Sequence, residues 1–550
     1  MAEPSDEELI PELLERLKPL GFSRTLRQKV GGNLVLTGAL RTNDGPVACS
    51  IAIDREFRRI PRVTLLEIPP KLLPVAPHLG SGGELCYAAT GTYVFDIFNP
   101  IEQTLAFIQR AEQVLGEIMR GELIDDLAEE FFAYWWGAYC YIDTDRLETG
   151  ELQVFSSGES ERSGRTFEIF LTDDLARTSK KLSLLRDEFT QENFIIHSIS
   201  TSARPRPSQD SWPPKTLGDF VNWQYQLDKN VPKKLLRRVA AAYRSEFGAC
   251  LFVISSPLYK YGLIVKFPDL EERRALRKAA NGFQYLYELK ITPVATFRID
   301  DRYLVERNIP GVKNLSGLKI GIVGCGTIGG YLAELLVKAG AGLAGGKLTL
   351  IDPDEFGPQN LGRHRLGFTH LYRPKAIALA DELSKAMPSA GIEGVPLDVR
   401  DVRLPELDLL IDATGDEAVG YWIAAQYHKV VPILNVWIEG RGAAVRTLFK
   451  LPGIGACYRC LCDYNKDRHF VSVSEDFGEI FAGHGCEGLY VPFPATVSVQ
   501  AACLSAEAIL DWVGGWTLPS LRTRVTDPNF TLSTDDCSPL VKIGCPACCT

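Results

Sequence analysis

The sequence predicts an α/β protein whose C-terminal part is a Rossmann-like domain with a mostly parallel sheet and a zinc site. Three observations predict this class. A Gly-rich turn stands between an apolar run at 319–323 and a helix-like run at 331–339. Further apolar runs at 347–351 and 407–411 are separated by longer segments, as in strand–helix–strand units. Two C-x-x-C pairs follow, and an α+β region and a mixed α/β bridging region precede the turn.

The Gly-rich turn, residues 324–330, predicts a nucleotide-binding site. Gly324, Gly326 and Gly329 allow the backbone to approach a phosphate closely, and the helix that follows directs its N–H groups and positive dipole end at the anion. An unspecified nucleotide-binding Rossmann domain is the alternative interpretation of this turn.

Phosphate-directed side chains follow the second strand. Asp352 stands where a ribose-binding carboxylate belongs. Asn360, Arg363 and Lys375 come next. They are more phosphate-directed groups than a hydride-transfer site needs, and they suit a triphosphate under attack by a carboxylate. Asp412 directly follows the run at 407–411 and would lie at the carboxyl edge of the sheet, where it could hold Mg²⁺.

The C-terminal cysteines predict a four-thiolate zinc site formed by Cys457, Cys460, Cys545 and Cys548. Such a site would hold the end of the chain against the domain, closing a long loop. Ordinary free or redox cysteines are the alternative, and Cys462 and Cys549 lie close enough to leave the ligand set open.

Cys486 is the candidate nucleophile of the C-terminal domain. It stands in the Gly-flanked segment 484–489, ahead of an apolar helix at 496–512, whereas Cys503 falls inside that helix and is expected in the core. The alternative is that Cys486 only lines a loop.

The N-terminal region is expected to place a second cysteine in an accessible loop. We expect a helix at 6–17, strands at 32–40 and 47–53, a Pro-rich stretch at 60–77 and a long helix at 100–120. Cys86 ends the Gly-rich segment 80–86 between the Pro-rich stretch and the long helix. Its alternative interpretation is a structurally unconstrained cysteine.

The C-terminal part, about 305–550, resembles the adenylating domain of ubiquitin-activating enzymes and of the bacterial activators of sulfur carriers. The resemblance implies that ATP is the cofactor and that the domain is dimeric. It implies that Asp352 binds ribose, that Asn360, Arg363 and Lys375 bind phosphates, and that Asp412 binds Mg²⁺. Arg307 would reach the partner subunit's nucleotide, and Cys486 would capture the adenylated carrier.

The N-terminal region resembles ubiquitin-conjugating enzymes. The segment 59–63 matches their Pro-containing strand, and the segment from His78 to Cys86 matches the approach to their acceptor cysteine. Their His-Pro-Asn element is replaced here by His78-Leu79-Gly80, so the usual Asn is missing. The resemblance implies that Cys86 accepts an acyl group from Cys486 and passes it to an amine.

The fusion of the two activities resembles the activating-conjugating proteins of bacterial CBASS antiphage operons. That resemblance implies a protein substrate activated at its C-terminus, in those systems the neighbouring cyclic-oligonucleotide synthase. We therefore expect three domains: a conjugating-enzyme-like domain at 1–122, a bridging domain at 123–303 and an adenylation domain at 304–550. We found no catalytic constellation in the bridging domain, and we expect its aromatic run at 131–136 to be core or interface.

Composition is consistent with a cytoplasmic enzyme. The 550 residues include 14 cysteines, and the N-terminus does not resemble a signal peptide, so we expect thiol and metal chemistry rather than disulfides. No long apolar stretch predicts a membrane span, and a net charge of −9 argues against nucleic-acid binding.

Two other classes stay open. One is a sulfur-carrier or peptide adenylyltransferase without conjugation, which needs Lys375 and Asp412 but not Cys86. The other is a dimeric scaffold that binds ATP without turnover. Because a complete set of phosphate-directed groups has no purpose in a scaffold, we favour the enzymes.

Overall fold

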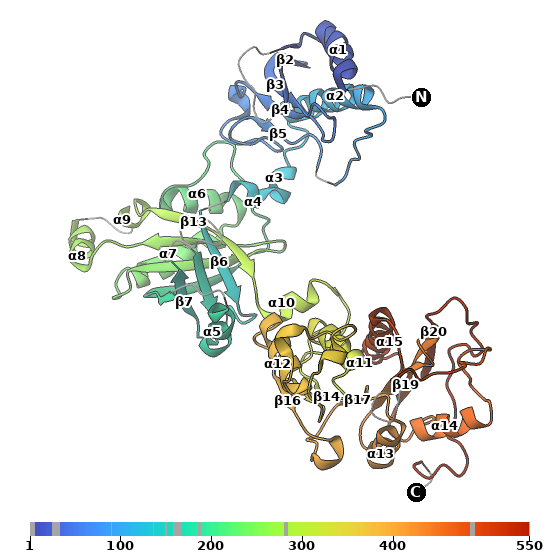
Figure 1. Cartoon of the computed structure of the whole chain (residues 1–550). Helices are drawn as coiled ribbons and strands as arrows, with labels where there is room; N and C mark the ends of the chain where they lie inside the picture. The colour runs from blue at the N-terminus through green and yellow to red at the C-terminus, as the bar shows by residue number, and fades with distance from the viewer. Residues whose placement is uncertain are drawn as a thin grey trace. The chain divides into compact units, whose positions relative to one another are not determined.

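The computed structural model describes residues 6–24, 33–89, 91–135, 137–148, 151–157, 168–184, 189–279, 284–483 and 490–548. The chain divides into two compact units. The first comprises residues 1–141, 147–170 and 189–297, and the second 142–146, 171–188 and 298–550. Within the described residues the strands form three sheets (Figure 1). No helix among these residues is long and apolar enough to cross a membrane.

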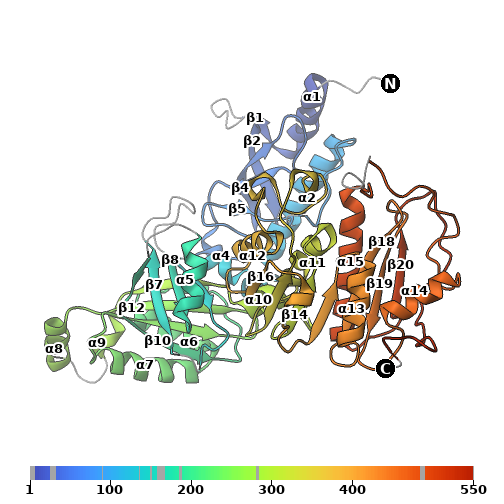
Figure 2. The ribbon, with the colours of Figure 1, turned by 60° about the horizontal axis from the view of Figure 1, so that its bottom comes forward.

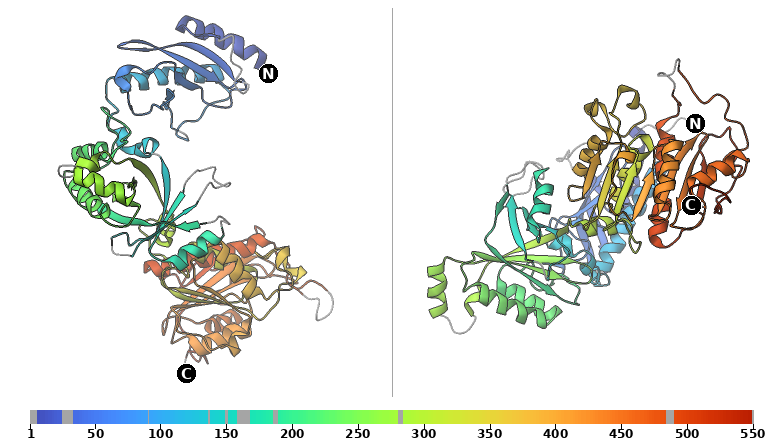
Figure 3. Two further views of the ribbon diagram at one scale, coloured as in Figure 1. Left: turned by 90° about the vertical axis from the view of Figure 1, so that its left-hand side faces the viewer. Right: turned by 90° about the horizontal axis from the view of Figure 1, so that it is seen from below.

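The N-terminal sheet is an antiparallel meander in the order β1-β2-β3-β4-β5. A long helix, α2, lies along this sheet (Figure 3). Its residues Phe107, Ala111 and Leu115 are buried in the core cluster that the helix shares with the sheet. The elements are α1 (Asp6–Leu17), β1 (Ser23–Arg24), β2 (Leu34–Thr42), β3 (Gly45–Ile53), β4 (Arg62–Leu65), β5 (Glu84–Leu85) and α2 (Pro100–Met119), with short 3-10 helices at Lys18–Leu20 and Pro70–Leu72.

The middle sheet has the order β10-β11-β12-β13-β6-β8-β7-β9, with β10 and β11 parallel. Its first elements are α3 (Asp126–Glu129), α4 (Phe131–Tyr134), β6 (Ala138–Asp143), β7 (Gln153–Ser157), β8 (Glu168–Thr172), α5 (Leu175–Ser183) and β9 (Phe189–Gln191). The others are β10 (Phe194–Ser200), α6 (Leu217–Leu227), α7 (Asn230–Ala242), β11 (Ala249–Ser255), β12 (Lys260–Lys266), α8 (Leu270–Ala279), α9 (Gln284–Tyr287) and β13 (Ile291–Arg298). A basic cluster at 233–238 lies on α7, with Lys233, Lys234 and Arg237 exposed, as a solvated helix face should be.

The C-terminal sheet has the order β16-β15-β14-β17-β18-β19-β20. The first five strands are parallel, and β19 and β20 are antiparallel additions. The strands are β14 (Lys319–Val323), β15 (Lys347–Ile351), β16 (Ile392–Val395), β17 (Leu409–Asp412), β18 (Ile433–Glu439), β19 (Ala444–Lys450) and β20 (Leu521–Val525). The helices are α10 (Asp301–Glu306), α11 (Thr327–Lys338), α12 (Lys375–Ala386), α13 (Glu417–Tyr427), α14 (Tyr458–Lys466) and α15 (Ala495–Gly514), with 3-10 helices at Pro358–Asn360, Phe368–His370 and Val399–Asp401. Figure 2 shows α15 running beside β18 and β19.

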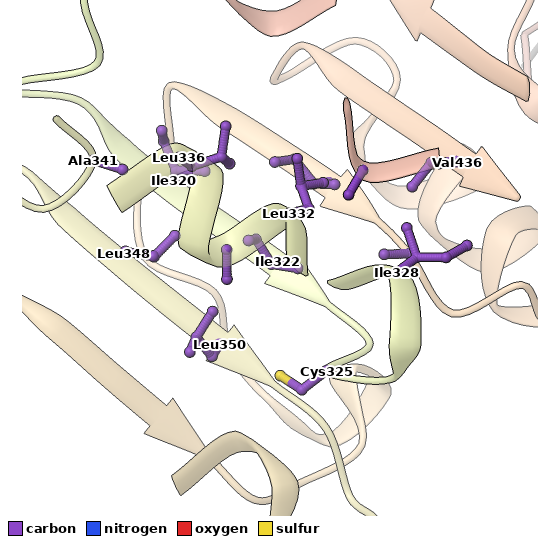
Figure 4. Packing of buried hydrophobic residues seen from close by; sticks show 14 of the residues in the cluster. Ile320, Ile322, Cys325, Ile328, Leu332, Leu336, Ala341, Leu348, Leu350 and Val436 are labelled. Carbon is purple, nitrogen blue, oxygen red and sulfur yellow. The ribbon is translucent and has the colours of Figure 1, made fainter. Parts of the chain in front are cut away.

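The core of this domain holds the Gly-rich turn in place. Ile320 and Ile322 of β14 and Leu332 and Leu336 of α11 are fully buried in one cluster (Figure 4). Cys325, in the turn itself, is fully buried in the same cluster. The turn is therefore fixed at both ends by packing, which is what a preformed phosphate cradle requires.

The predicted fold class is confirmed, with a mostly parallel C-terminal sheet and a mixed middle sheet. Several predicted elements have the observed bounds, among them the helix at 6–17 and the strands at 319–323 and 347–351. The domain boundaries 1–122, 123–303 and 304–550 stay predictions.

Candidate functional site

The candidate nucleotide site lies at the switch point of the C-terminal sheet. Strand β14 pairs in parallel with β15 on one side and with β17 on the other. In an open α/β sheet, a crevice forms at the carboxyl ends of the strands at that point. The Gly-rich turn follows β14, Asp352 follows β15, and Asp412 ends β17. The fold therefore brings these predicted residues to one edge.

Each glycine of the turn has its own geometric role. Gly324 has φ +90°, and a Cβ there would lie 2.8 Å from the backbone of Ala413 and Thr414 after β17. A Cβ on Gly329 would lie 1.9 Å from the Gly324 oxygen, so helix and turn pack too closely for a side chain. A Cβ on Gly326 would meet nothing within 4 Å. Gly326 therefore faces open space at the start of α11, as a phosphate-binding position should.

Asp352 links the carboxyl ends of β14 and β15 through hydrogen bonds. One carboxylate oxygen accepts from the Cys325 N–H at 2.7 Å and the other from the Asp354 N–H at 2.8 Å. Burial raises the pKa of Asp352, although these backbone bonds oppose the rise. An imidazole fixes the same turn, since His364 Nε2 donates to the Cys325 oxygen at 2.7 Å and burial lowers the pKa of His364 to about 4.

Asp412 is more deeply enclosed, with 4% of its surface exposed. Its Oδ1 accepts from the Thr414 hydroxyl at 2.7 Å, and its Oδ2 accepts from the Asn435 amide at 2.9 Å. Burial is the main cause of a raised pKa. A carboxylate held in this way keeps lone pairs free for a cation, and a bound cation would stabilise its buried negative charge. Asp412 therefore fits the Mg²⁺ ligand that the sequence predicts.

The predicted phosphate ligands lie on the segment between β15 and α12. Lys375 begins α12, is 8% exposed, and donates from Nζ to Asp354 at 2.7 Å. Arg363 donates to the Val491 oxygen at 2.7 Å and lies over the Phe493 ring at 4.3 Å. Asn360 accepts from the Gly357 N–H at 3.0 Å. Of the three, Lys375 is the one for which the described part of the structure gives an ion-pair partner, Asp354, that a phosphate would have to displace.

A cavity of about 690 Å³ opens beside Arg363. Its lining combines the segment 359–363, Arg441 and the segment 490–494. Phe493 and Pro492 make it partly apolar, which suits an extended peptide better than a nucleotide. Cys486, the predicted nucleophile, lies in 484–489, outside the described residues, and directly precedes this lining in the chain.

Arg307 is not part of the crevice. It follows α10, whose Val305 packs against Leu343 and Ala390. Those two residues precede β15 and β16 and so lie at the amino edge of the sheet, opposite the crevice. The exposed Arg307 is therefore on the wrong side of the sheet for the nucleotide of its own chain.

The four predicted zinc ligands form one cluster, with all four sulfurs within 4.8 Å of one another. Cys457 Sγ lies 3.7 Å from Cys460 Sγ and 3.8 Å from Cys545 Sγ, and Cys460 Sγ lies 3.8 Å from Cys548 Sγ. With Zn–S bonds of about 2.3 Å, sulfurs at tetrahedral corners would be about 3.8 Å apart. The cluster therefore has the dimensions of a four-cysteine zinc site, and Cys462 is not a member of it.

Cys86 is exposed and directly follows the short strand β5. Its N–H donates to the His78 oxygen at 2.8 Å, and Leu79 and Leu85 bridge across the loop between them. Gly83, with φ +85°, permits this loop, because a Cβ there would lie 2.5 Å from the Leu65 oxygen. Burial, and then the charge of Glu130, raise the pKa of the Cys86 thiol.

Sequence analysis missed the residues that support both reactive ends. Asn435, His364 and Asp354 complete the nucleotide crevice, and Glu130 and Asp126 contact His78 beside Cys86. Asn435 carries one usable signal, since it is a polar residue within the apolar run 433–438 and is 3% exposed. Nothing local marks Glu130, which lies far along the chain from His78.

Family models match two parts of the chain. The ThiF family matches residues 302–538, and prokaryotic E2 family B matches residues 21–139. These ranges contain the nucleotide crevice and Cys86 respectively. The two resemblances that the sequence motifs indicate are thereby confirmed.

Curated relatives match the whole arrangement. An ATP-dependent ubiquitin transferase-like protein, Cap2, of Pseudomonas aeruginosa is 48% identical over 91% of each chain. Its namesake from Escherichia coli is 26% identical over 85% of each chain. A crystal structure of E. coli MccB with ATP is 19% identical over 42% of this chain and 67% of its own, with a TM-score of 0.32, too low to add to the fold described above. At 48% identity over nine-tenths of both sequences, the chain belongs to the Cap2 family of ATP-dependent ubiquitin transferase-like enzymes.

Proposed function

We propose that this enzyme activates the C-terminal carboxylate of a protein with ATP and passes it through Cys486 and Cys86 to an amine. The observation that carries the proposal is the pairing, in one chain, of a phosphate-directed crevice with an exposed cysteine in an E2-type loop. A plain adenylyltransferase has no use for the second feature.

The first step is adenylation. The substrate carboxylate attacks the α-phosphorus of ATP, a C(O)O–P bond forms, and pyrophosphate leaves. Lys375 and Arg363 would neutralise the phosphates, Asp352 would bind the ribose, and Asp412 would hold the Mg²⁺ that offsets the leaving charge. The cavity at 359–363 and 490–494 would admit the extended C-terminus of the substrate.

Thioester formation at Cys486, one thioester exchange and an aminolysis would follow. The Cys486 thiolate attacks the adenylate carbonyl and AMP leaves; the Cys86 thiolate then attacks that thioester and Cys486 leaves as thiolate. An amine finally attacks the Cys86 thioester, an amide bond forms, the C–S bond breaks, and the ammonium proton passes to solvent. The C-terminal carbonyl of the substrate stays activated until the last step.

The resemblance to CBASS fusion proteins supports one choice of substrate, a neighbouring cyclic-oligonucleotide synthase modified at its C-terminus. The position of Arg307 at the edge of the sheet opposite the crevice supports a homodimer in which Arg307 serves the partner subunit. Zinc at the four-cysteine cluster would hold the C-terminal segment against α14. We propose a cytoplasmic location, because free cysteines of these kinds need a reducing compartment.

Intact-mass analysis without reductant tests the proposal. The chain is co-expressed with its genomic neighbours, as wild type and as Cys86→Ala, Cys486→Ala and Cys503→Ala. Cys503 is the matched control. The expectation that it lies in the core was wrong: it is exposed, because the buried stripe of α15 runs through Ala501, Ala502, Leu504 and Ser505 and leaves Cys503 on the other face. We expect a reductant-labile adduct that survives Cys503→Ala, together with loss of final conjugation in both other variants.

Two outcomes would count against this function. If the Cys86→Ala variant still formed the adenylate and conjugated its substrate normally, Cys86 would not carry the acyl group. Adenylate formation with no adduct and no conjugate at all would favour the sulfur-carrier or peptide adenylyltransferase.

A further inference from the structure

We propose that the connector at 125–135 completes the Cys86 site, with Glu130 and Asp126 acting as positioning residues that hold His78 and, through it, Cys86. The inference rests on the proposed function, in which Cys86 carries the acyl group. It assigns a role to residues outside the E2-type meander, in a chain that lacks the usual Asn after the histidine.

The backbone of His78 and that of Cys86 are coupled. His78 has φ +58°, which is a left-handed backbone conformation. For any residue other than glycine this conformation is unfavourable in free energy, so contacts around the residue have to hold it in place. In this conformation its carbonyl accepts the Cys86 N–H at 2.8 Å. A change at His78 would therefore move the cysteine directly.

Glu130 holds both the main chain and the ring of His78. Its Oε2 accepts from the His78 N–H at 2.9 Å, and its Oε1 lies 2.6 Å from His78 Nδ1. Asp126 lies 2.9 Å from the other ring nitrogen, Nε2. Because both nitrogens face carboxylates, the arrangement is satisfied fully only by the imidazolium, which donates from both.

The other face of the connector is anchored in the middle domain. Phe131 and Trp135 are fully buried there, and Trp135 Nε1 lies within hydrogen-bond distance of the Gly262 and Val294 oxygens, at 3.1 and 3.2 Å. Glu130 and Tyr134, each one residue earlier, project towards the Cys86 loop instead, and the Tyr134 hydroxyl donates to the Ala76 oxygen at 2.9 Å. The middle domain thus supports the reactive loop through one short segment.

The charge of His78 gives the arrangement a defined pH range. Hydrogen bonding to Glu130 is the main cause that raises the pKa of His78 to about 9, with Asp126 adding to it and burial opposing it. A folded pKa above the ordinary 6.5 means that this support is complete below about pH 6.5 and is lost as pH rises through about 9. The ionisable groups that face the ring are Glu130 and Asp126 of the connector, with Tyr134 and Cys86 beside Glu130.

The test uses the full chain and a simple acyl donor, the mercaptoethanesulfonate thioester of a glycine-terminated peptide. Acylation of the Cys86 peptide is followed by mass spectrometry between pH 6 and 10, and His78 is titrated by NMR. The variants are Glu130→Gln, which keeps the size of the side chain, and Asp126→Asn, with Glu129→Gln as control. Glu129 is an exposed carboxylate of the same connector.

We expect Glu130→Gln to lower the His78 pKa towards 6.5 and to slow Cys86 acylation about tenfold between pH 7 and 9. The difference in acylation rate between Glu130→Gln and the wild type should become smaller above pH 9, where wild-type His78 has itself lost its proton. Asp126→Asn should have a smaller effect in the same direction, and Glu129→Gln none. A merely structural role would give a deficit independent of pH.

The inference is overturned if the pKa of wild-type His78 is near 6.5, or if Glu130→Gln and Glu129→Gln acylate Cys86 at the same rate at every pH. Failure of the proposed function has a different signature, since Cys86→Ala would then leave conjugation unchanged while His78 still titrated near pH 9. The two failures are therefore distinguishable.

Discussion

The nucleotide crevice and the Cys86 site are built in opposite ways. In the crevice, the carboxylates of Asp352 and Asp412 are buried and held by backbone N–H groups and neighbouring polar side chains at the ends of adjacent strands. At Cys86, the thiol is exposed and its loop is held by carboxylates from a connector outside the meander. The first site is fixed by its own fold, whereas the second depends on another part of the chain.

We therefore expect the two sites to respond differently to substitutions in and around them. A phosphate site must be rigid and must exclude water, because its charges act most strongly in a preorganised, low-dielectric environment. An acceptor cysteine has to meet two protein surfaces in turn, so it has to remain exposed. A support that comes from the connector at 125–135 holds the loop without covering the thiol.

The largest expected effect is that of Lys375→Ala on the crevice. We expect ATP–pyrophosphate exchange with the substrate to fall by about 100-fold or more, because a buried ammonium that meets developing phosphate charge is removed. Stability should change little, since the abandoned Asp354 side chain is 66% exposed and can be hydrated.

Lys385→Ala is the matched control, being an exposed lysine at the other end of the same helix, paired with Glu382. Exchange should be normal in this variant. If Lys375→Ala retained ATP–pyrophosphate exchange, Lys375 would not be a phosphate ligand. The contrast between a rigid nucleotide crevice and the Cys86 site would then lose its support.

Zinc removal is expected to have the next largest effect, and on stability rather than on Cys86. Cys545→Ser takes one corner from the cluster, so we expect zinc content by elemental analysis to fall and the melting temperature to drop by several degrees. Chelation of the wild type should do the same.

Cys462→Ser is the control for the ligand set, since its thiol is close in sequence but outside the cluster. It should keep its zinc. A loss of zinc in Cys462→Ser equal to that in Cys545→Ser would contradict the assignment of ligands. Acylation of Cys86 by the simple thioester should be unaffected by either change, because the cluster belongs to the other compact unit.

The sequence predicted most of the crevice and the zinc cluster because each is encoded by local spacing. Gly324, Gly326 and Gly329 lie on one turn, and Asp352 and Asp412 are where two apolar strands end, so a strand pattern is enough to place them together. The C-x-x-C pairs are likewise visible in the sequence itself. Elements such as β14 and β15 were predicted with their observed bounds because continuous apolar runs of that length are typical of buried parallel strands.

The rest depends on contacts that no periodicity encodes. Asp412 meets Asn435 only because β17 and β18 are neighbours in register, and Lys375 meets Asp354 because the chain returns to the sheet between them. The contact between His78 and Glu130 joins two parts of the chain across a whole helix, α2. The aromatic run at 131–136 was expected to be core or interface. Phe131 and Trp135 are core, and Trp136 lies outside the described residues. Glu130 and Tyr134 beside them contact the Cys86 loop.

The smallest expected effect is that of Tyr134→Phe, and it separates loop support from direct participation. The hydroxyl donates to the Ala76 oxygen and lies 3.2 Å from Glu130 Oε2, while the half-buried ring stays in place in the variant. Loss of one such hydrogen bond costs about 1 kcal/mol, so we expect Cys86 acylation to slow by no more than about fivefold.

Tyr225→Phe is the matched control, because Tyr225 is an exposed tyrosine on α6 in the same compact unit, and acylation should be unchanged in it. The pKa of Tyr134 is raised above its ordinary value, mainly by burial, so its hydroxyl stays protonated throughout the range from pH 6 to 10. The modest deficit in Tyr134→Phe should therefore be independent of pH, unlike that in Glu130→Gln. A deficit as large as that of Glu130→Gln would mean that the hydroxyl meets the reacting carbonyl itself, and the connector would then supply a catalytic group as well as a support.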